Sequence, residues 1–174
     1  MIHSFLLQII ECVVCSGPSN RIFSKLRYLF YKPLLKYSGG IFTSGEHFCI
    51  ESPTNISIGK NVYFNRNIFL AAIEEDENSQ IQIGNNCLFG PNVVIVAGNH
   101  NVYSKGKQCI RDLDSIGGSV HIGNDCWVGA NVTITSGITI GDHSVIGANS
   151  VVTRNIPSYV IAAGTPAKVI RYRG

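Results

Sequence analysis

Branched aliphatic residues recur at every sixth position between residues 122 and 157. The series contains no exception and consists of Ile122, Val128, Ile134, Ile140, Ile146 and Val152. Four residues after each of them comes a small or aliphatic side chain. An amphipathic helix repeats its apolar positions every 3.6 residues and a strand every two, so a strict period of six indicates another structure. A repeat this short cannot bury its own aliphatic side chain and must stack on copies of itself, as in a solenoid.

The period predicts a parallel β-helix of triangular cross-section, in which each hexapeptide forms one short side and one corner. We expect the branched residue to point inward, and glycine or asparagine to carry the backbone through the corner at positive φ. Glycine follows the aliphatic residue at positions 123, 129, 141 and 147. Three hexapeptides would make one coil. An antiparallel protein with glycine turns is disfavoured, because hairpins alternate hydrophobicity with a period of two.

Two segments, 122–130 (IGNDCWVGA) and 163–171 (AGTPAKVIR), resemble the hexapeptide-repeat acyltransferases, which form a left-handed parallel β-helix. The resemblance covers roughly residues 50–171 and is greatest to the sugar and polysaccharide O-acetyltransferases of the maltose and galactoside type. It implies the left-handed winding, which the period itself does not determine. It also implies acetyl-CoA as acyl donor, a sugar or polysaccharide hydroxyl as acceptor, and a homotrimer. Acetylation of an amino-sugar nucleotide on nitrogen is the near alternative.

The regular repeat predicts a division into a helical appendage, residues 1–49, and a β-helix with a C-terminal tail, residues 50–174. Residues 1–16 carry apolar side chains at helical spacing, and a second helix is predicted from Ser19 or Asn20 to about Tyr31. Its apolar stripe consists of Ile22, Leu26, Leu29 and Phe30. The appendage either caps the open end of the β-helix or lies on a membrane surface through residues 1–36, its basic side chains toward lipid headgroups.

The composition of the chain limits which partners and which cellular compartment we expect. The net charge of +3 is too small to suggest a nucleic-acid partner, and the first apolar stretch is too short to span a membrane. The six cysteines form no pair of CxxC motifs, and no signal peptide is evident, so we expect a reducing cytoplasm. If the helices contact lipid, the protein would lie at the inner face of the membrane.

The six-residue phase is lost twice. Residues 74–79 are predicted to form a loop at a corner, and a longer inserted loop is expected near residues 99–119. A loop of that length in a compact solenoid is usually functional. His100 stands where the regular side gives way to this insertion, in the sequence Gly98-Asn99-His100. Imidazole, with a pKa near 6.5, can take a proton from an acceptor hydroxyl and return it to a leaving thiolate.

The resemblance implies that His100 is the catalytic base and that an acidic residue of the preceding coil orients it. Glu74 is the candidate, although Glu75 and Asp76 are not distinguished from it by the broken phase. Backbone N–H groups near Gly129 and Ala130 would stabilise the oxyanion. Contacts to coenzyme A are implied for Ala130, Ala148, Thr153 and Arg154 along the thioester arm, and for Lys168 and Arg171 at the nucleotide phosphates.

The acceptor site implied by the resemblance includes Asn65, with Trp127 as a wall or as part of a subunit interface. For Lys168 and Arg171 the alternative is an ordinary solvated tail. No metal is expected. A zinc lyase of the carbonic-anhydrase type would need three histidines around one ion, and His100, His121 and His143 contain no closely spaced pair. Outward positions such as Trp127, Val145 and Val151 are apolar, which favours burial between three packed prisms.

Overall fold

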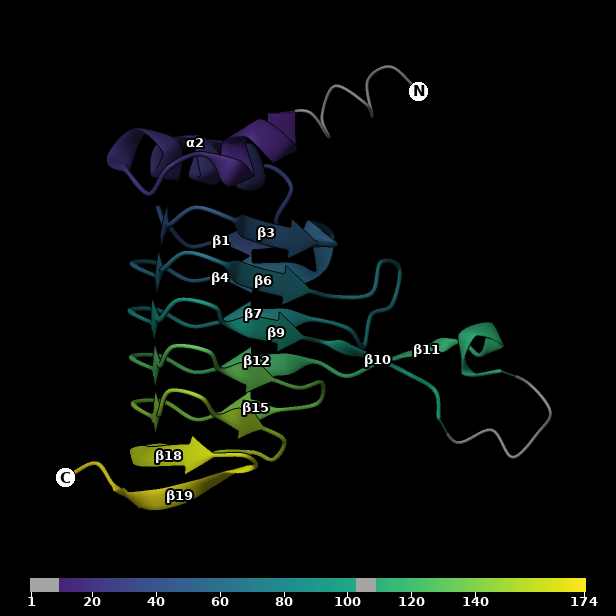
Figure 1. The fold of residues 1–174 in the computed structure, drawn as a ribbon, viewed down its shortest axis with the longest axis vertical. Coiled ribbons are helices and arrows are strands. Elements are labelled where there is room, and N and C mark those ends of the chain that lie inside the picture. The colour runs from purple at the N-terminus through teal and green to yellow at the C-terminus, as the bar shows by residue number, and fades with distance from the viewer. Residues whose placement is uncertain (1–9, 103–108) are drawn as a thin grey trace.

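The computed structural model describes residues 10–102 and 109–174. A helical cap covers one end of a stack of flat coils, the C-terminus lies at the other end, and an arm projects from the side (Figure 1). Residues 10–16 are helical, and residues 1–9 of the predicted first helix lie outside the described residues. The second predicted helix is confirmed as α2 (Arg21–Tyr31), whose N-cap Asn20 accepts a hydrogen bond from the backbone N–H of Phe23 at 3.0 Å.

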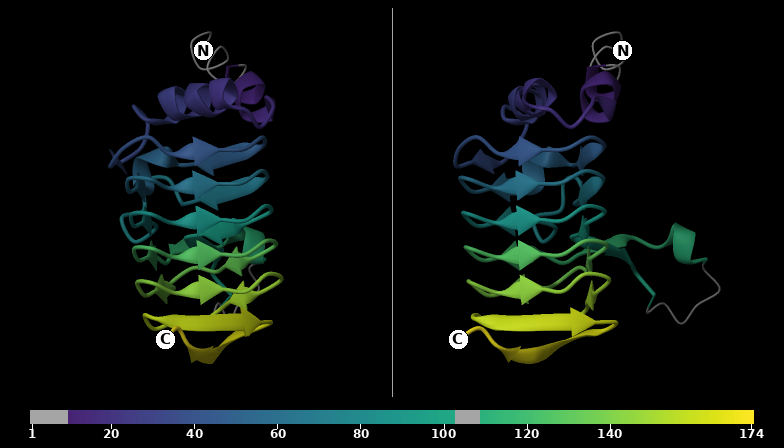
Figure 2. Two further views of the ribbon diagram at one scale, coloured as in Figure 1. Left: turned by 90° about the vertical axis from the view of Figure 1, so that its left-hand side faces the viewer. Right: turned by 60° about the vertical axis from the view of Figure 1, so that its left-hand side comes forward.

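Each coil adds one strand to each of three parallel sheets, which we call faces A, B and C in the order in which the chain visits them (Figures 1 and 2). Face A consists of β1 (Tyr37–Ser38), β4 (Ile56–Ile58), β7 (Ile81–Ile83), β12 (Val120–Ile122) and β15 (Thr139–Ile140). Face B consists of β2 (Thr43–Ser44), β5 (Tyr63–Phe64), β8 (Leu88–Phe89), β13 (Trp127–Val128), β16 (Val145–Ile146), β18 (Val160–Gly164) and the antiparallel β19 (Ala167–Tyr172). Face C consists of β3 (Phe48–Glu51), β6 (Ile68–Ala71), β9 (Val94–Val96), β14 (Thr133–Ile134) and β17 (Val151–Val152).

The register confirms the predicted coil. Ile122 pairs with Ile140 on face A, so three hexapeptides separate residues that stack directly on one another. All six members of the aliphatic series are buried in one continuous core. In the coils nearest the cap, phenylalanines fill the prism, with ring centroids 5.0 Å apart for the tilted pair Phe48 and Phe64 and 4.9 Å apart for the stacked pair Phe64 and Phe89. The parallel ladder reaches back to Tyr37, and the division at residue 50 stays a prediction.

The corners correct one detail of the sequence interpretation. The left-handed conformation is taken mostly by asparagine, as at Asn86, Asn92 and Asn131, and also by Asp125 and His143, but not by the glycines that follow the aliphatic positions. Those glycines are required because neighbouring coils approach closely. A Cβ atom on Gly84 would lie 2.6 Å from the carbonyl oxygen of Gly123 in the next coil. The glycine of the repeat therefore serves stacking between coils, and the asparagine serves the turn.

Helix α2 lies over the first coil (Figure 2), and the face that it buries there is not its apolar stripe. Its buried residues are Ser24, Arg27, Tyr28 and Tyr31. Ile22, Leu26 and Leu29 of the predicted apolar stripe are instead 71%, 41% and 53% exposed. The physical reason is that the coil end presents unpaired backbone groups, so polar side chains face it: the guanidinium of Arg27 donates to the carbonyl oxygen of Ser44 at 3.0 Å.

Candidate functional site

Irregular segments gather along one edge of the prism, where the chain passes from face C to face A. The segment η1 (Pro53–Asn55), the predicted loop at residues 74–79 and the projecting arm all leave the coils at this C–A edge. The regular corners elsewhere are short and similar in conformation. The C–A edge is therefore the part of the solenoid at which the sequence departs from the repeat.

The arm begins with β10 (Gly98–His100), which pairs with β11 (Ser115–Gly117) as an antiparallel stem, and it carries η2 (Ile110–Asp112). His100 stands opposite Ser115 at the outer end of this stem. The stem places His100 just outside the prism with an exposed side chain. The predicted insertion is thus present, and its residues 103–108 lie outside the described residues.

A cavity of about 360 Å³ lies beneath His100 at the C–A edge. Its lining includes Glu51 at the end of β3, Ile73 beyond β6, and Ser115 and His100 from the arm. Since the cavity combines an apolar floor with a carboxylate, a hydroxyl and an imidazole, it offers a proton acceptor beside groups that can bind hydroxyl-bearing ligands.

The acidic residue of the cavity is Glu51, which sequence reasoning missed. Glu74, the predicted partner of His100, is exposed in its turn and does not line the cavity. The carboxylate of Asp76 accepts a hydrogen bond from the backbone N–H of Asn78 at 2.9 Å and so stabilises its own loop. Among the acids near the break, the geometry thus brings Glu51 rather than Glu74 into the cavity that His100 lines.

Along face C, beside this edge, residues at outward positions stack from coil to coil, and we call this series the outward column. Glu51 pairs in register with Ala71, and Ala71 pairs with Val96. Thr135 and Thr153 continue the column in the next two coils, following the paired residues Ile134 and Val152. The column therefore links the predicted donor-binding residue Thr153, and the adjacent exposed Arg154, to the cavity under His100.

Other predicted site residues lie on a different edge, where face B passes into face C. A Cβ atom on Gly129 would lie 2.7 Å from the backbone nitrogen of Ala148, which places Ala130 and Ala148 in adjacent coils at this B–C edge. Asn65 follows β5 at the same edge. Trp127 projects from the middle of face B and lines a separate cavity of about 360 Å³ with Leu88. Within one subunit these residues do not meet His100.

The terminal hairpin of β18 and β19 carries the two predicted phosphate contacts. Lys168 pairs across from Ala163, and Arg171 pairs across from Ile161. Both basic side chains are exposed. Arg173, by contrast, donates to the carboxylate of Asp125 at 3.3 Å. The hairpin therefore presents two cations to solvent at the end of the stack farthest from the cap.

The cysteines do not supply a nucleophile to the cavity. Burial raises the pKa of the Cys49 thiol to about 11, so it is protonated at neutral pH. A hydrogen bond from Cys87 lowers the pKa of Cys126, but both side chains are sealed inside the prism. Chemistry at the C–A edge thus has an imidazole base available and no accessible thiolate from these residues.

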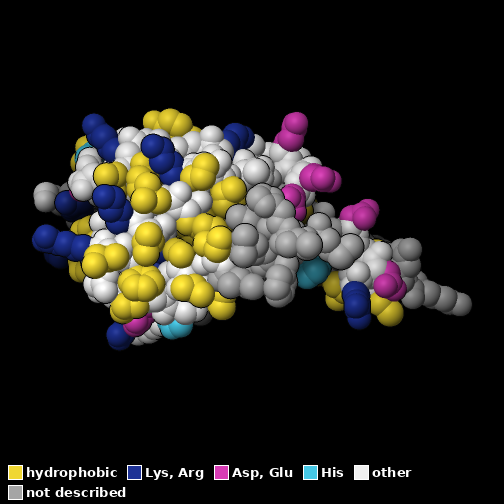
Figure 3. Space-filling model, turned by 90° about the horizontal axis from the view of Figure 1, so that it is seen from above, with side chains coloured by type: hydrophobic (Ala, Val, Ile, Leu, Met, Phe, Trp, Pro, Cys, Tyr) yellow, Lys and Arg dark blue, Asp and Glu magenta, His cyan; other side chains and the backbone are white. Residues whose placement is uncertain are grey.

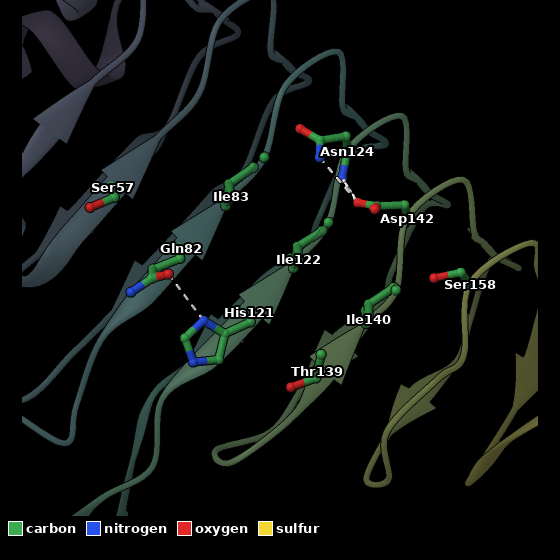
Figure 4. A pocket seen from close by; sticks show the side chains of 13 residues that line it. Ser57, Gln82, Ile83, His121, Ile122, Asn124, Thr139, Ile140, Asp142 and Ser158 are labelled. Atoms are coloured by element: carbon green, nitrogen blue, oxygen red, sulfur yellow. Dashed lines mark hydrogen bonds between the residues drawn. The ribbon is translucent and has the colours of Figure 1, made fainter.

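His121 and His143 have local partners of their own. The Nδ1 atom of His121 lies 3.2 Å from the side-chain oxygen of Gln82, in a polar hollow of about 450 Å³ on face A (Figure 4). The Nδ1 atom of His143 lies 2.9 Å from the carboxylate of Asp125, and this hydrogen bond lowers the pKa of Asp125. Across residues 10–102 and 109–174, no three histidine, cysteine or acidic side chains come together in a metal-binding arrangement.

Residues 119–154 match the family described as "Bacterial transferase hexapeptide (six repeats)", and residues 80–98 match "Hexapeptide repeat of succinyl-transferase". A galactoside O-acetyltransferase from Escherichia coli (strain K12) is 39% identical over 135 residues, which are 74% of this chain and 63% of that protein. The chain belongs to the hexapeptide-repeat proteins. It spans less than two thirds of the length of this relative.

Solved structures of acetyltransferases agree with the fold over nearly the whole chain. A maltose O-acetyltransferase from Clostridium difficile 630 superimposes with a TM-score of 0.83 at 28% identity, covering 98% of this chain and 86% of that one. A galactoside acetyltransferase in complex with coenzyme A gives a TM-score of 0.76 at 29% identity, covering 98% and 80%. The fold is a left-handed parallel β-helix, as the resemblance implied.

Proposed function

We propose that this hexapeptide-repeat protein is an acetyltransferase that moves an acetyl group from acetyl-CoA to a hydroxyl of a sugar or polysaccharide unit. The observation that carries the proposal is His100, held by an antiparallel stem above a cavity at the break of the repeat. Similarity to galactoside and maltose O-acetyltransferases supports the same class of donor and acceptor. The cytoplasm, where acetyl-CoA is available, is the location that we assign to this activity.

In the proposed reaction His100 is the general base. It accepts the proton of the acceptor hydroxyl while that oxygen attacks the thioester carbonyl, which forms a carbon–oxygen bond. The carbon–sulfur bond then breaks, and the proton passes from the imidazolium to the departing thiolate. Atoms and charge balance without a covalent intermediate, so the reaction requires no cysteine nucleophile.

The donor would lie along the outward column of face C. Its pantetheine arm would pass Thr153 and Arg154 toward His100, and its phosphates would contact Lys168 and Arg171 from the face B hairpin of the neighbouring subunit. The oxyanion needs an unshared N–H donor. The N–H of Gly129 is already bonded to the carbonyl oxygen of Ile146 at 2.8 Å, so the backbone of Ala130 becomes the candidate.

A complete site then requires more than one subunit. His100, Thr153 and Arg154 lie at the C–A edge, whereas Asn65, Ala130 and Ala148 lie at the B–C edge. We propose a homotrimer in which the C–A edge of one prism faces the B–C edge of its neighbour. Asn65 and the acceptor would then meet His100 across the interface. Trp127, in the middle of face B, fits better in the subunit contact than in the acceptor pocket of its own chain.

The test compares His100→Ala with His121→Ala, a matched removal of a histidine from face A. The purified trimer would be supplied with acetyl-CoA and a panel of galactosides, maltose and amino sugars, and free thiol would be measured. We expect His100→Ala to lose about 10²- to 10⁴-fold in turnover, the usual contribution of a general base. Coenzyme A affinity, measured by calorimetry, should stay unchanged in both variants.

Two results would contradict the proposal. If His100→Ala kept more than about a tenth of the wild-type rate, the base would lie elsewhere, since a general base contributes at least about 10²-fold. If the wild-type protein bound no coenzyme A and released no thiol with any hydroxyl or amine acceptor, the acetyltransferase assignment itself would be wrong.

A further inference from the structure

The outward surface of α2 carries an apolar stripe, whereas a solvent-facing helix normally turns its polar residues outward. Ile22, Leu26 and Leu29 stand at i, i+4 and i+7, so they form one stripe along the helix, and all three are exposed. Ile10 and Val13 of the adjoining helical segment are exposed as well. We call the α2 stripe of Ile22, Leu26 and Leu29 the cap face.

This orientation is fixed by polar contacts on the opposite side of the helix. Arg27 donates to the carbonyl oxygens of Gly17 and Ser44, and the hydroxyl of Ser24 accepts the backbone N–H of Ser44 at 3.0 Å. The hydroxyl of Tyr31 donates to the carboxylate of Glu11 at 2.9 Å and so ties the helix to residues 10–16. Turning the helix to bury the cap face would break all of these bonds. The apolar stripe is therefore held outward by the fold.

Cations border the cap face. Arg21 and Lys25 share the side of the helix next to the stripe, and Lys32 and Lys36 follow at its C-terminal end, all exposed. The sequence contains no acidic residue between Glu11 and Glu46. Seen from the cap end, hydrophobic and basic side chains share the surface, while most acidic side chains in view lie toward the arm (Figure 3).

We propose that the cap face docks on the surface of an anionic lipid bilayer, with α2 lying in the plane of the interface. An apolar stripe flanked by lysine and arginine is the arrangement by which peripheral helices bind such surfaces. None of the helices formed by the described residues is long and apolar enough to cross a membrane. The inference does not rest on the proposed acetyltransferase activity.

Charge decides between lipid and a second copy of the chain as the occupant. A two-fold contact between cap faces would bring Arg21, Lys25 and Lys32 of one chain against the same cations of another, and no acidic residue of α2 would offset them. Anionic headgroups neutralise these cations, while the stripe enters the acyl boundary. The face therefore complements a bilayer and opposes self-association.

The experiment is flotation of the full-length protein with vesicles of phosphatidylcholine alone or with an equal part of phosphatidylglycerol. We expect binding to the anionic vesicles that weakens as salt is added. Lys25→Gln with Lys32→Gln should lower the partition coefficient by about 25-fold, because each cation near such a surface contributes about fivefold. Leu26→Ser with Leu29→Ser should abolish it.

Val169→Ser with Ile170→Ser is the matched control, because it removes two exposed aliphatic side chains from the opposite end of the stack. It should float like the wild type. Failure of the wild type to bind anionic vesicles at low salt would overturn the proposal. Equal loss in the control variant would overturn it too, as would light scattering that showed the Leu26 and Leu29 variant to disrupt an assembly of cap faces in the absence of lipid.

Discussion

Glu51 and His100 line one cavity although they belong to the first coil and to the arm after the third coil. Glu51 ends β3 with an exposed carboxylate, at the top of the outward column of face C. A carboxylate at this place can accept hydrogen bonds from acceptor hydroxyls, and such charge-assisted bonds are the strong ones. We therefore expect Glu51 to position the acceptor beneath His100.

Glu51→Gln should lower kcat/KM for the sugar acceptor by about 10- to 100-fold, since a hydrogen bond to a charged group contributes about 1.5–3 kcal/mol. The KM for acetyl-CoA should not change, because the carboxylate lies at the far end of the column from Thr153. Steady-state kinetics with each substrate varied in turn would measure this. Glu74→Gln is the matched control, and a larger loss in that variant would restore Glu74 as the functional acid.

At the residue scale, sequence reasoning could find His100 because the loss of the six-residue phase marks the break at which it stands. It could not find Glu51, because the coils that precede the break do not keep the 18-residue spacing of regular coils. Glu51 pairs with Ala71, and Ala71 with Val96, across insertions of different length. The resemblance therefore implies an acid of the preceding coil, near Glu74, while the acidic residue that lines the cavity comes from a coil farther away.

Among the elements, strands were predictable and helix orientation was not. The inward series from Ile122 to Val152 follows from period alone, because each residue must stack on its copy. For α2, the apolar stripe containing Leu26 predicts a buried face, yet Arg27 and Tyr31 are buried instead. Hydrogen bonds to backbone groups at the end of the first coil outweigh the burial of aliphatic side chains there, and a sequence pattern does not contain that information.

The terminal hairpin carries a prediction of its own. Lys168→Ala with Arg171→Ala should raise the KM for acetyl-CoA by about 10-fold or more, because each charge-assisted contact to phosphate contributes about 1.5–3 kcal/mol. The KM for the acceptor should stay constant. Arg173→Ala, which removes a cation already paired with Asp125, should leave both constants near the wild-type values. An unchanged KM for acetyl-CoA in the double variant would return Lys168 and Arg171 to the solvated-tail interpretation.

Faces A and B of the whole molecule differ in the polarity of their outward side chains. On face B, Tyr63, Leu88 and Trp127 stack in register and are 44%, 51% and 54% exposed, with Val145 next to them. Face A presents Gln82, His121 and Thr139 in the corresponding positions (Figure 4). An apolar ladder on one face and a polar ladder on another are what a prism that packs with its own copies requires.

We expect the protein to be a trimer in solution, and Leu88→Glu with Trp127→Glu to convert it into a folded, inactive monomer. Burying a large apolar side chain contributes roughly 1.5–3 kcal/mol, so placing two carboxylates in the contact of every subunit should outweigh the association. Both positions are exposed in the isolated prism, so its own core is unaffected. Light scattering would give the mass, circular dichroism the fold, and thiol release the activity.

Gln82→Glu with Thr139→Glu adds the same charges to face A and should stay trimeric and active. A face B variant that is monomeric and retains full turnover would show that each subunit carries a complete site, and that the C–A and B–C edges do not meet in catalysis.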